Sequence, residues 1–183
     1  MGAYSPAPVV TPEMHQRIPD QVIRPTVAGM ASEGLPYTGF LYAGVMIDAA
    51  GVPRVLEYNC RFGDPETQPI MLRMKSDLIA HCLAAIEGRL DSETAAWDER
   101  AALGVVLAAG GYPDAYQKGD IISGLPRREE AARKVFHAGT TEKDGQVVTA
   151  GGRVLCATAL GNSVAEAQSA AYELARQIHW HNV

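Results

Sequence analysis

The residues with the clearest capacity for chemistry lie between Val55 and Gln68. The run begins as a strand because its first residues are apolar or β-prone. Side chains alternate between the two faces of a strand, so Glu57, Asn59 and Arg61 are expected on one face. Carboxylate and amide oxygens suit Mg²⁺, and a guanidinium binds phosphate or carboxylate bidentately. The spacing alone fits a metal and phosphate site, and equally an amphipathic strand with a solvated polar face.

The residues that follow this strand favour a functional site over a connecting loop. Within a few positions the chain adds Asp64, Glu66 and Gln68 to Arg61, with a glycine and a proline among them. A loop that only connects two elements does not need two acids, an arginine and an amide together. We therefore expect the strand and the loop after it to form one site.

This run resembles the metal-binding strand and following loop of the ATP-grasp ligases, and more narrowly those of the glycinamide ribonucleotide synthetase family. The resemblance extends from Met1 to about Trp180. The segments that carry it are Glu57–Gln68, Met1–Pro6, Gly39–Gly44 and Gly110–Pro113.

The resemblance implies an ATP-dependent ligase of purine biosynthesis that joins glycine to 5-phosphoribosylamine. Glycine is first phosphorylated to glycyl phosphate, and the amine then displaces phosphate to give glycinamide ribonucleotide. In this interpretation Glu57 and Asn59 hold Mg²⁺ or Mn²⁺ across the phosphates of ATP. Arg61 stabilises the transferring group or the glycine carboxylate, and Asp64 and Glu66 orient a substrate amine.

The resemblance also assigns a role to the first residues of the chain and indicates which part of the family's enzyme the chain corresponds to. Substrate binding falls on the backbone of Gly2, Ala3, Tyr4 and Ser5, which lies along the phosphoribosylamine. The family carries a long portion before this segment, so the chain resembles the C-terminal part of a larger enzyme. We expect no easily measured turnover from the isolated chain. Two alternatives stay open: a non-catalytic module with a residual metal and substrate face, and another ATP-grasp ligase or carboxylase.

The expected fold class is α+β, and we place a domain boundary in the polar segment near residue 99. Residues 1–99 would form the C-terminal half of an ATP-grasp fold, with a kinked helix, a hairpin buried on both faces and two further helices. Residues 100–183 would form a small β-rich, barrel-like domain closed by one helix. The expected helices cover 11–32, 65–74, 76–88 and 164–179, after a loop over 1–12. The expected strands cover 38–48, 54–60, 102–109, 121–122, 134–138, 146–149 and 153–159.

Composition narrows the class of protein and its partners. The chain has 183 residues, 47% of them hydrophobic, and a net charge of −5 without a basic run, which disfavours a nucleic-acid partner. No apolar stretch reaches the length of a membrane span. Its three cysteines are widely spaced, which argues against a disulfide framework and favours a reducing cytoplasm. We therefore expect small-molecule substrates and no membrane partner, and the sequence leaves the oligomeric state open.

Overall fold

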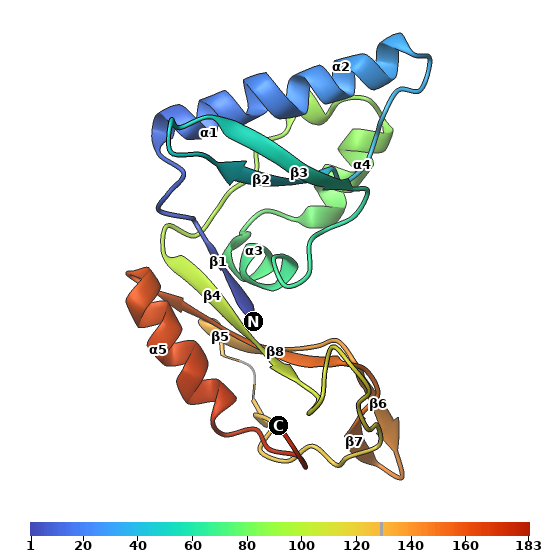
Figure 1. The fold of residues 1–183 in the computed structure, drawn as a ribbon, viewed down its shortest axis with the longest axis vertical. Helices are drawn as coiled ribbons and strands as arrows, with labels where there is room; N and C mark the ends of the chain where they lie inside the picture. The colour runs from blue at the N-terminus through green and yellow to red at the C-terminus, as the bar shows by residue number, and fades with distance from the viewer. Residues whose placement is uncertain (129) are drawn as a thin grey trace. The chain divides into compact units, whose positions relative to one another are not determined.

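The structure is a computed structural model that describes residues 1–128 and 130–183 (Figure 1). These residues form two compact units, each of which gathers separate parts of the chain. The sheet unit comprises Met1–Ser5, Asp64–Lys75 and Trp97–Val183, and the hairpin unit comprises Pro6–Gly63 and Ser76–Ala96. The predicted domain 100–183 falls within the sheet unit, together with two earlier segments. The boundary at residue 99 stays a prediction.

The hairpin unit begins with the predicted kinked helix. The Thr11 hydroxyl accepts the N–H of Met14 at 3.3 Å and caps the first turn, as expected for a threonine before a proline. Pro19 has no N–H to donate, and there the helix widens into a π-helical turn before it resumes. The three consecutive segments are α1 (Pro12–Ile18), η1 (Pro19–Ile23) and α2 (Arg24–Ser32).

The predicted hairpin is confirmed as β2 (Tyr42–Ile47) and β3 (Pro53–Asn59), which pair antiparallel. Asp48 shapes the turn between them, since its carboxylate accepts the N–H groups of Ala50 at 3.0 Å and Val52 at 2.9 Å. The hydrogen bond from Val52 leads the causes that lower the pKa of the Asp48 carboxyl. Asp48, which lies between the two predicted strands, therefore acts as a turn former.

The expected burial of this hairpin on both faces is wrong. Leu56 of β3 is 66% exposed and Met46 of β2 is 57% exposed. The preceding helices pack against the face on which the hydroxyls of Tyr58 and Thr26 lie 2.7 Å apart. An apolar run in the sequence allows a strand to be buried on both faces. Burial of the second face also requires another element to pack against it, which the run does not provide.

Two short helices complete the elements between β3 and residue 97. α3 (Thr67–Arg73) belongs to the sheet unit, and α4 (Leu78–Ile86) belongs to the hairpin unit with the single turn η2 (Leu90–Ser92). The helix predicted over 76–88 forms as α4, and Asp77 caps it by accepting the N–H of Ile79 at 2.8 Å. The apolar side chains of α4, which an amphipathic helix is expected to bury, are largely exposed, with Ile79 at 64% and Ile86 at 77%. Of the helix's own residues only Ala84 is buried.

The sheet unit is built on a four-stranded antiparallel sheet in the order β1-β4-β8-β5. Its outer strand β1 corrects one expectation, because residues 2–5 were predicted as part of a loop. Gly2 pairs with Val105 and Ser5 with Ala102, and the prolines that forbid pairing begin only at Pro6. The strands are β1 (Gly2–Ser5), β4 (Ala101–Ala108), β5 (Arg133–His137) and β8 (Arg153–Gly161).

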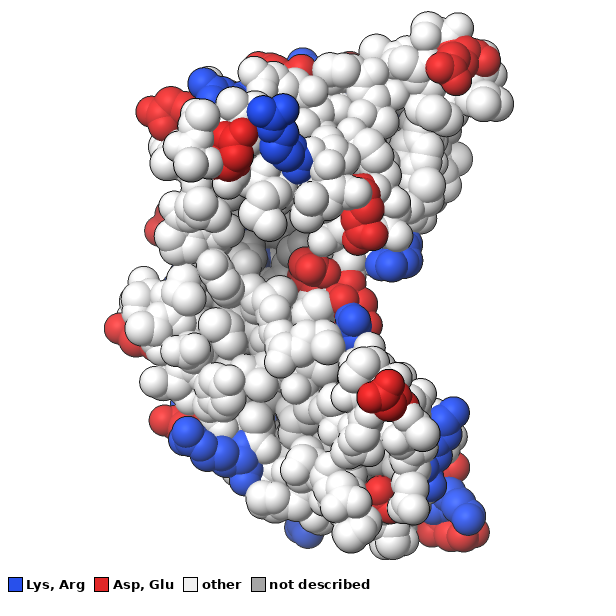
Figure 2. Space-filling model, in the orientation of Figure 1, with Lys and Arg blue, Asp and Glu red and all other residues white. Residues whose placement is uncertain are grey.

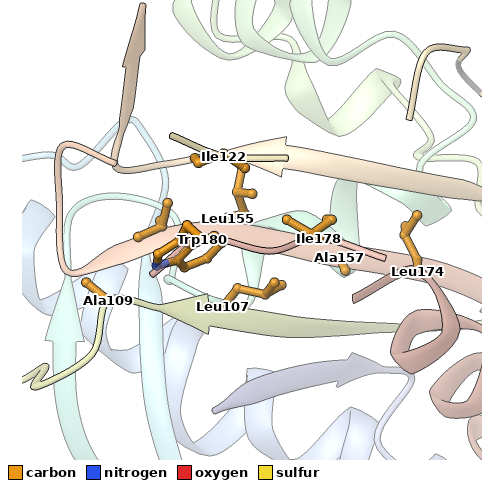
Figure 3. Close-up of a cluster of buried hydrophobic side chains, with 9 residues drawn as sticks. Leu107, Ala109, Ile122, Leu155, Ala157, Leu174, Ile178 and Trp180 are labelled. Carbon is orange, nitrogen blue, oxygen red and sulfur yellow. The ribbon is translucent and has the colours of Figure 1, made fainter. Parts of the chain in front are cut away.

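Helices cover both faces of this sheet. The predicted last helix forms as α5 (Val164–Ala175), capped by Ser163, and its buried Ala167 and Ala171 pack beside Ala159 of β8. On the opposite face a Cβ added to Gly104 would meet Pro69 of α3, so α3 lies close to the strand there. The larger core, shown in Figure 3, packs side chains from β4, β8 and α5 with Ile122, Ile178 and Trp180.

The α+β class is confirmed, with one difference in the sheet. β6 (Thr140–Lys143), which was not predicted, pairs with β7 (Gln146–Thr149) as a separate hairpin. The main sheet has two outer strands and is open, rather than barrel-like as expected. Within the described ranges, no helix has the length and hydropathy needed to cross a membrane.

Candidate functional site

The carboxylate of Glu57 and the amide of Asn59 lie on one face of β3, as their spacing predicted. The register pairs Gly44 with Glu57 and then Val45 with Val55, so Leu56 is an extra residue in β3 and forms a β-bulge. A Cβ added to Gly44 would lie 3.2 Å from Cγ of Glu57, so the Glu57 side chain covers that glycine. Tyr58, between the two polar residues, turns to the helix-covered face.

Arg61 lies just beyond the strand, within reach of Asn59. Its NH2 donates to Oδ1 of Asn59 at 3.4 Å, and its NH1 donates to the carbonyl of Phe62 at 2.8 Å. The Phe62 ring stacks on Phe40 with centroids 4.1 Å apart, which fixes the start of the loop. Asn59 and Arg61 are therefore in direct contact, and the shared role of Glu57, Asn59 and Arg61 stays a prediction.

The oxygen donors suit a hard divalent cation that keeps most of its own water. Glu57 is exposed and Asn59 is half-buried, so both oxygens can be reached from solvent. Among the described residues, no group of three or more His, Cys, Asp and Glu side chains could hold a metal ion. One carboxylate and one amide match Mg²⁺, which proteins bind through one or two groups plus water and phosphate oxygens.

Asp64 belongs to the sheet unit, where an arginine from β8 holds it. NH1 of Arg153 donates to the carbonyl of Asp64 and lies 3.2 Å from its carboxylate Oδ2. Nε of the same arginine donates to the Tyr112 hydroxyl at 3.1 Å. The hydrogen bond to Tyr112 and the nearby Asp64 carboxylate raise the pKa of Arg153, which keeps the guanidinium charged.

Gln68, in the same loop, presents an unsatisfied oxygen. Its Nε2 donates to Oδ1 of Asp64 at 3.5 Å, while its Oε1 is buried and has no hydrogen-bond partner within the described part of the chain. A buried acceptor without a donor is costly, so this oxygen is a candidate contact for a bound molecule. Glu66 is half-buried and lies just before α3.

Residues 2–5 lie on the outer strand β1. A Cβ on Gly2 would collide with the carbonyl of Gly104, so this close pairing requires glycine. Tyr4 is 47% exposed, whereas the Ser5 hydroxyl accepts NH1 of Arg73 at 2.8 Å. A shallow pocket of about 240 Å³ is lined by Met1–Tyr4, by β4 and by Gln168 and Tyr172 of α5.

Sequence reasoning missed two arginines that hold these segments. Arg153 lies 89 positions from Asp64, and its local sequence carries no signal for the contact. Arg73 bonds Ser5 and also donates to the carbonyls of Asp98 and Arg100, at 2.9 Å and 3.0 Å. Among the partners of these two arginines, Tyr112 and Ser5 lie in segments that carry the family resemblance, Gly110–Pro113 and Met1–Pro6.

Comparisons with known protein families and with curated relatives agree on one family. Residues 1–67 match the phosphoribosylglycinamide synthetase ATP-grasp (A) domain, and residues 102–183 match the C domain of the same enzyme. The phosphoribosylamine–glycine ligases of Vibrio parahaemolyticus and Escherichia coli K12 are 72% and 68% identical to this chain, and each match covers 98% of this chain.

Solved structures agree with these relatives. The phosphoribosylamine–glycine ligase of Thermotoga maritima matches the whole chain with a TM-score of 0.85 and 38% identity, over 44% of its own length. The biotin carboxylase domain of a Hydrogenobacter thermophilus carboxylase, at 12% identity and a TM-score of 0.67, shares the fold. The chain spans 42% of the length of the two curated relatives named above. From the two domain matches and these identities, the chain belongs to the phosphoribosylglycinamide synthetase family.

Proposed function

We propose that this chain serves the ATP-dependent ligation of glycine to 5-phosphoribosylamine, which yields glycinamide ribonucleotide, ADP and phosphate through glycyl phosphate. The observation that carries the proposal is the 72% identity to the Vibrio parahaemolyticus phosphoribosylamine–glycine ligase, over 180 residues. The other ATP-grasp relatives share only 12–16% identity, so they support the fold and not a different substrate.

Glu57 and Asn59 would hold the divalent cation, Mg²⁺ or Mn²⁺, that the ATP-grasp family implies. When bound, such a cation neutralises charge on the transferring phosphoryl oxygens. The exposed carboxylate of Glu57 is the stronger ligand. Asn59 would offer the amide oxygen that now accepts a long hydrogen bond from Arg61.

Arg61 is assigned to the phosphate or to the glycine carboxylate. A guanidinium suits both groups because its parallel N–H donors match two oxygens at once. Its donation to the Phe62 carbonyl at 2.8 Å reduces its freedom and so lowers the entropy lost when it binds an anion.

Asp64 and Glu66 are assigned to the substrate amine, with Arg153 as a positioning residue for Asp64. A carboxylate can accept the N–H groups of an amine and orient its lone pair toward an acyl phosphate. Arg153 lies 3.2 Å from Oδ2 of Asp64, and Oδ1 accepts a long hydrogen bond of 3.5 Å from Gln68. Oδ1 is therefore the oxygen that we assign to substrate.

Residues Gly2, Ala3, Tyr4 and Ser5 are assigned to phosphoribosylamine. The close pairing of Gly2 with β4 and the bond from Arg73 to Ser5 fix the strand that would present this backbone. We propose small molecules as the only substrates and a cytoplasmic setting, which the three free cysteines favour. On the face drawn in Figure 2, acidic and basic side chains are interspersed, which does not suit a nucleic-acid partner.

A chimera tests the proposal. The 180 residues of the Vibrio parahaemolyticus ligase that match this chain are replaced by it, and ADP release is followed with ATP, Mg²⁺, glycine and freshly made phosphoribosylamine. We expect turnover within about tenfold of the parent enzyme. In the chimera, Glu57→Gln should lower kcat by about 10²-fold or more, since a charge-stabilising arrangement is lost.

Glu142→Gln is the matched control, because Glu142 is an exposed glutamate of β6. It should leave the rate within about twofold. A folded chimera, judged by circular dichroism and by its unfolding midpoint, that shows no glycine-dependent ADP release would refute the proposed reaction. Equal rates for the Glu57 and Glu142 variants would refute the metal assignment alone.

A further inference from the structure

A groove of about 300 Å³ lies along the outer edge of β5 in the sheet unit. β5 ends the strand order of its sheet, so one edge pairs with β8 and the other faces this groove. The groove is lined by all of β5 and by Leu125, Pro126 and Arg128. None of these residues was assigned a function above.

Hydrogen bonds at the two ends of β5 show which residues turn their backbone toward β8. The carbonyl of Ala132 accepts the N–H of Leu160 at 2.8 Å, and the N–H of Ala138 donates to Val154 at 3.1 Å. In an antiparallel pair, alternate residues direct both backbone groups to the same neighbour. The even-numbered residues of β5 therefore bond β8, and the odd-numbered residues point away from it.

The outward backbone groups are available at Val135 and His137. The third outward residue, Arg133, donates its N–H to the carbonyl of Glu130 at 3.3 Å. For Val135 and His137, no such partner is found among residues 1–128 and 130–183. The spacing of two donors and two acceptors at alternate residues is that required by an added β-strand.

The charge of the groove is one-sided. Arg128, Arg133, Lys134 and His137 line it, and no aspartate or glutamate does so among the described residues. Arg133 is partly neutralised by Glu173 of α5, 3.2 Å away, in a bridge that solvent screens. The chain as a whole has a net charge of −5, so this concentration of cations is local.

The same charges decide which strand can add to the edge. In an antiparallel second copy of β5 centred on Val135, Arg133 would lie opposite His137 and Lys134 opposite Phe136, so a second copy gains no pair of opposite charges. An acidic strand would instead meet the cations Arg128 and Arg133, which both line the groove. Leu125 and Val135 add an apolar contact at the centre of the groove.

We propose that the outer edge of β5 binds an extended acidic segment of another protein, which adds to the sheet as a fifth strand. Main-chain hydrogen bonds to Val135 and His137 provide the pairing. The cationic side chains select acidic residues on each side of a central apolar one.

The probe is a capped seven-residue peptide with two glutamates on each side of three valines, labelled for fluorescence anisotropy and titrated into the full 183-residue chain. We expect saturable binding, together with slower hydrogen exchange at the amides of Val135 and His137. Arg128→Glu should weaken binding about tenfold, which corresponds to about 1.4 kcal/mol. Arg127→Glu, the same change at the adjacent exposed arginine outside the groove, should change affinity by less than about threefold.

Two further probes separate strand addition from simple attraction of charge. A peptide of the same sequence with alternate N-methylated amides keeps every charge but loses the donors of one edge, and should bind at least about tenfold more weakly. Equal binding of the two peptides would overturn the proposal, as would displacement of the peptide by inorganic phosphate at matched ionic strength. Absence of saturation below about 1 mM, or equal effects of the two arginine variants, would also overturn it.

Discussion

Replacing Arg153 by methionine should loosen the loop that carries Asp64. The charged guanidinium donates one hydrogen bond to the Tyr112 hydroxyl and makes two contacts with Asp64. Neutral hydrogen bonds contribute about 0.5–1.5 kcal/mol to stability and those with charged groups about 1.5–3 kcal/mol. The Arg153 and Asp64 side chains are 30% and 47% exposed, so water replaces part of the lost bonding. We expect Arg153→Met to lower the free energy of unfolding by about 2 kcal/mol.

Urea unfolding of the 183-residue chain, followed by circular dichroism, measures this change. The thermal midpoint should fall by about 4–8 °C, the shift that about 2 kcal/mol produces in a chain of this size. Methionine retains the unbranched apolar stem, so lost packing contributes little. Arg127→Met removes an exposed arginine and should change stability by less than about 0.5 kcal/mol.

A double-mutant cycle tests the assigned partner. Asp64→Ala and Arg153→Met remove the two sides of one contact, so their effects should fall short of additivity by about 0.5–1.5 kcal/mol. Additive effects would show that Arg153 does not act through Asp64. A cost below about 0.5 kcal/mol for Arg153→Met would refute the larger inference that β8 holds this loop.

Three other predictions concern the pH dependence of stability, two glycine substitutions and the activity of the isolated chain. The side-chain hydrogen bond from Arg100 holds the pKa of Asp98 well below its usual range. The ionised Asp98 carboxylate therefore stabilises the fold above about pH 4, and this stabilisation is lost as the pH falls below that. Urea midpoints measured at pH 6 and pH 3 should differ less in Asp98→Asn than in the unaltered chain. Gly29→Ala should stabilise α2 by about 0.5–1 kcal/mol, because nothing lies within contact distance of the added methyl group. Gly104→Ala should destabilise the protein by about 1–3 kcal/mol, because the new Cβ would lie 2.8 Å from the Cys156 sulfur. Urea unfolding of both variants tests these opposite signs. The isolated chain should release no ADP above background with ATP, Mg²⁺, glycine and phosphoribosylamine, and turnover at a normal enzyme rate would contradict this.

Features fixed by neighbouring residues could be predicted from the sequence. Thr11, Asp77 and Ser163 each cap the helix that follows them, because a short polar side chain reaches the first free N–H groups. The Asp48 turn and the buried face of α5 follow from equally local patterns. Glu57 and Asn59 share a face because only one residue separates them.

Features fixed by distant residues could not be predicted in the same way. β1 forms because Ala102–Val105 offers a partner, and Gly2–Ser5 alone carries too few residues to signal a strand. The contact between Arg153 and Asp64 also joins segments far apart in the chain. The exposure of Leu56 and Ile86 differs from expectation because the pattern of apolar residues does not state what covers them.

The pairing of β1 with β4 sets an order of events during translation. Gly2 leaves the ribosome long before its partner Val105 has been added. At about 5–20 residues per second, synthesis of the residues up to β4 takes on the order of 5–20 s, and β1 waits that long for its partner. For that interval the segment 2–5 lacks the strand with which it pairs in the folded sheet. Early folding must therefore proceed in the intervening residues, and completion of this sheet must be a late event.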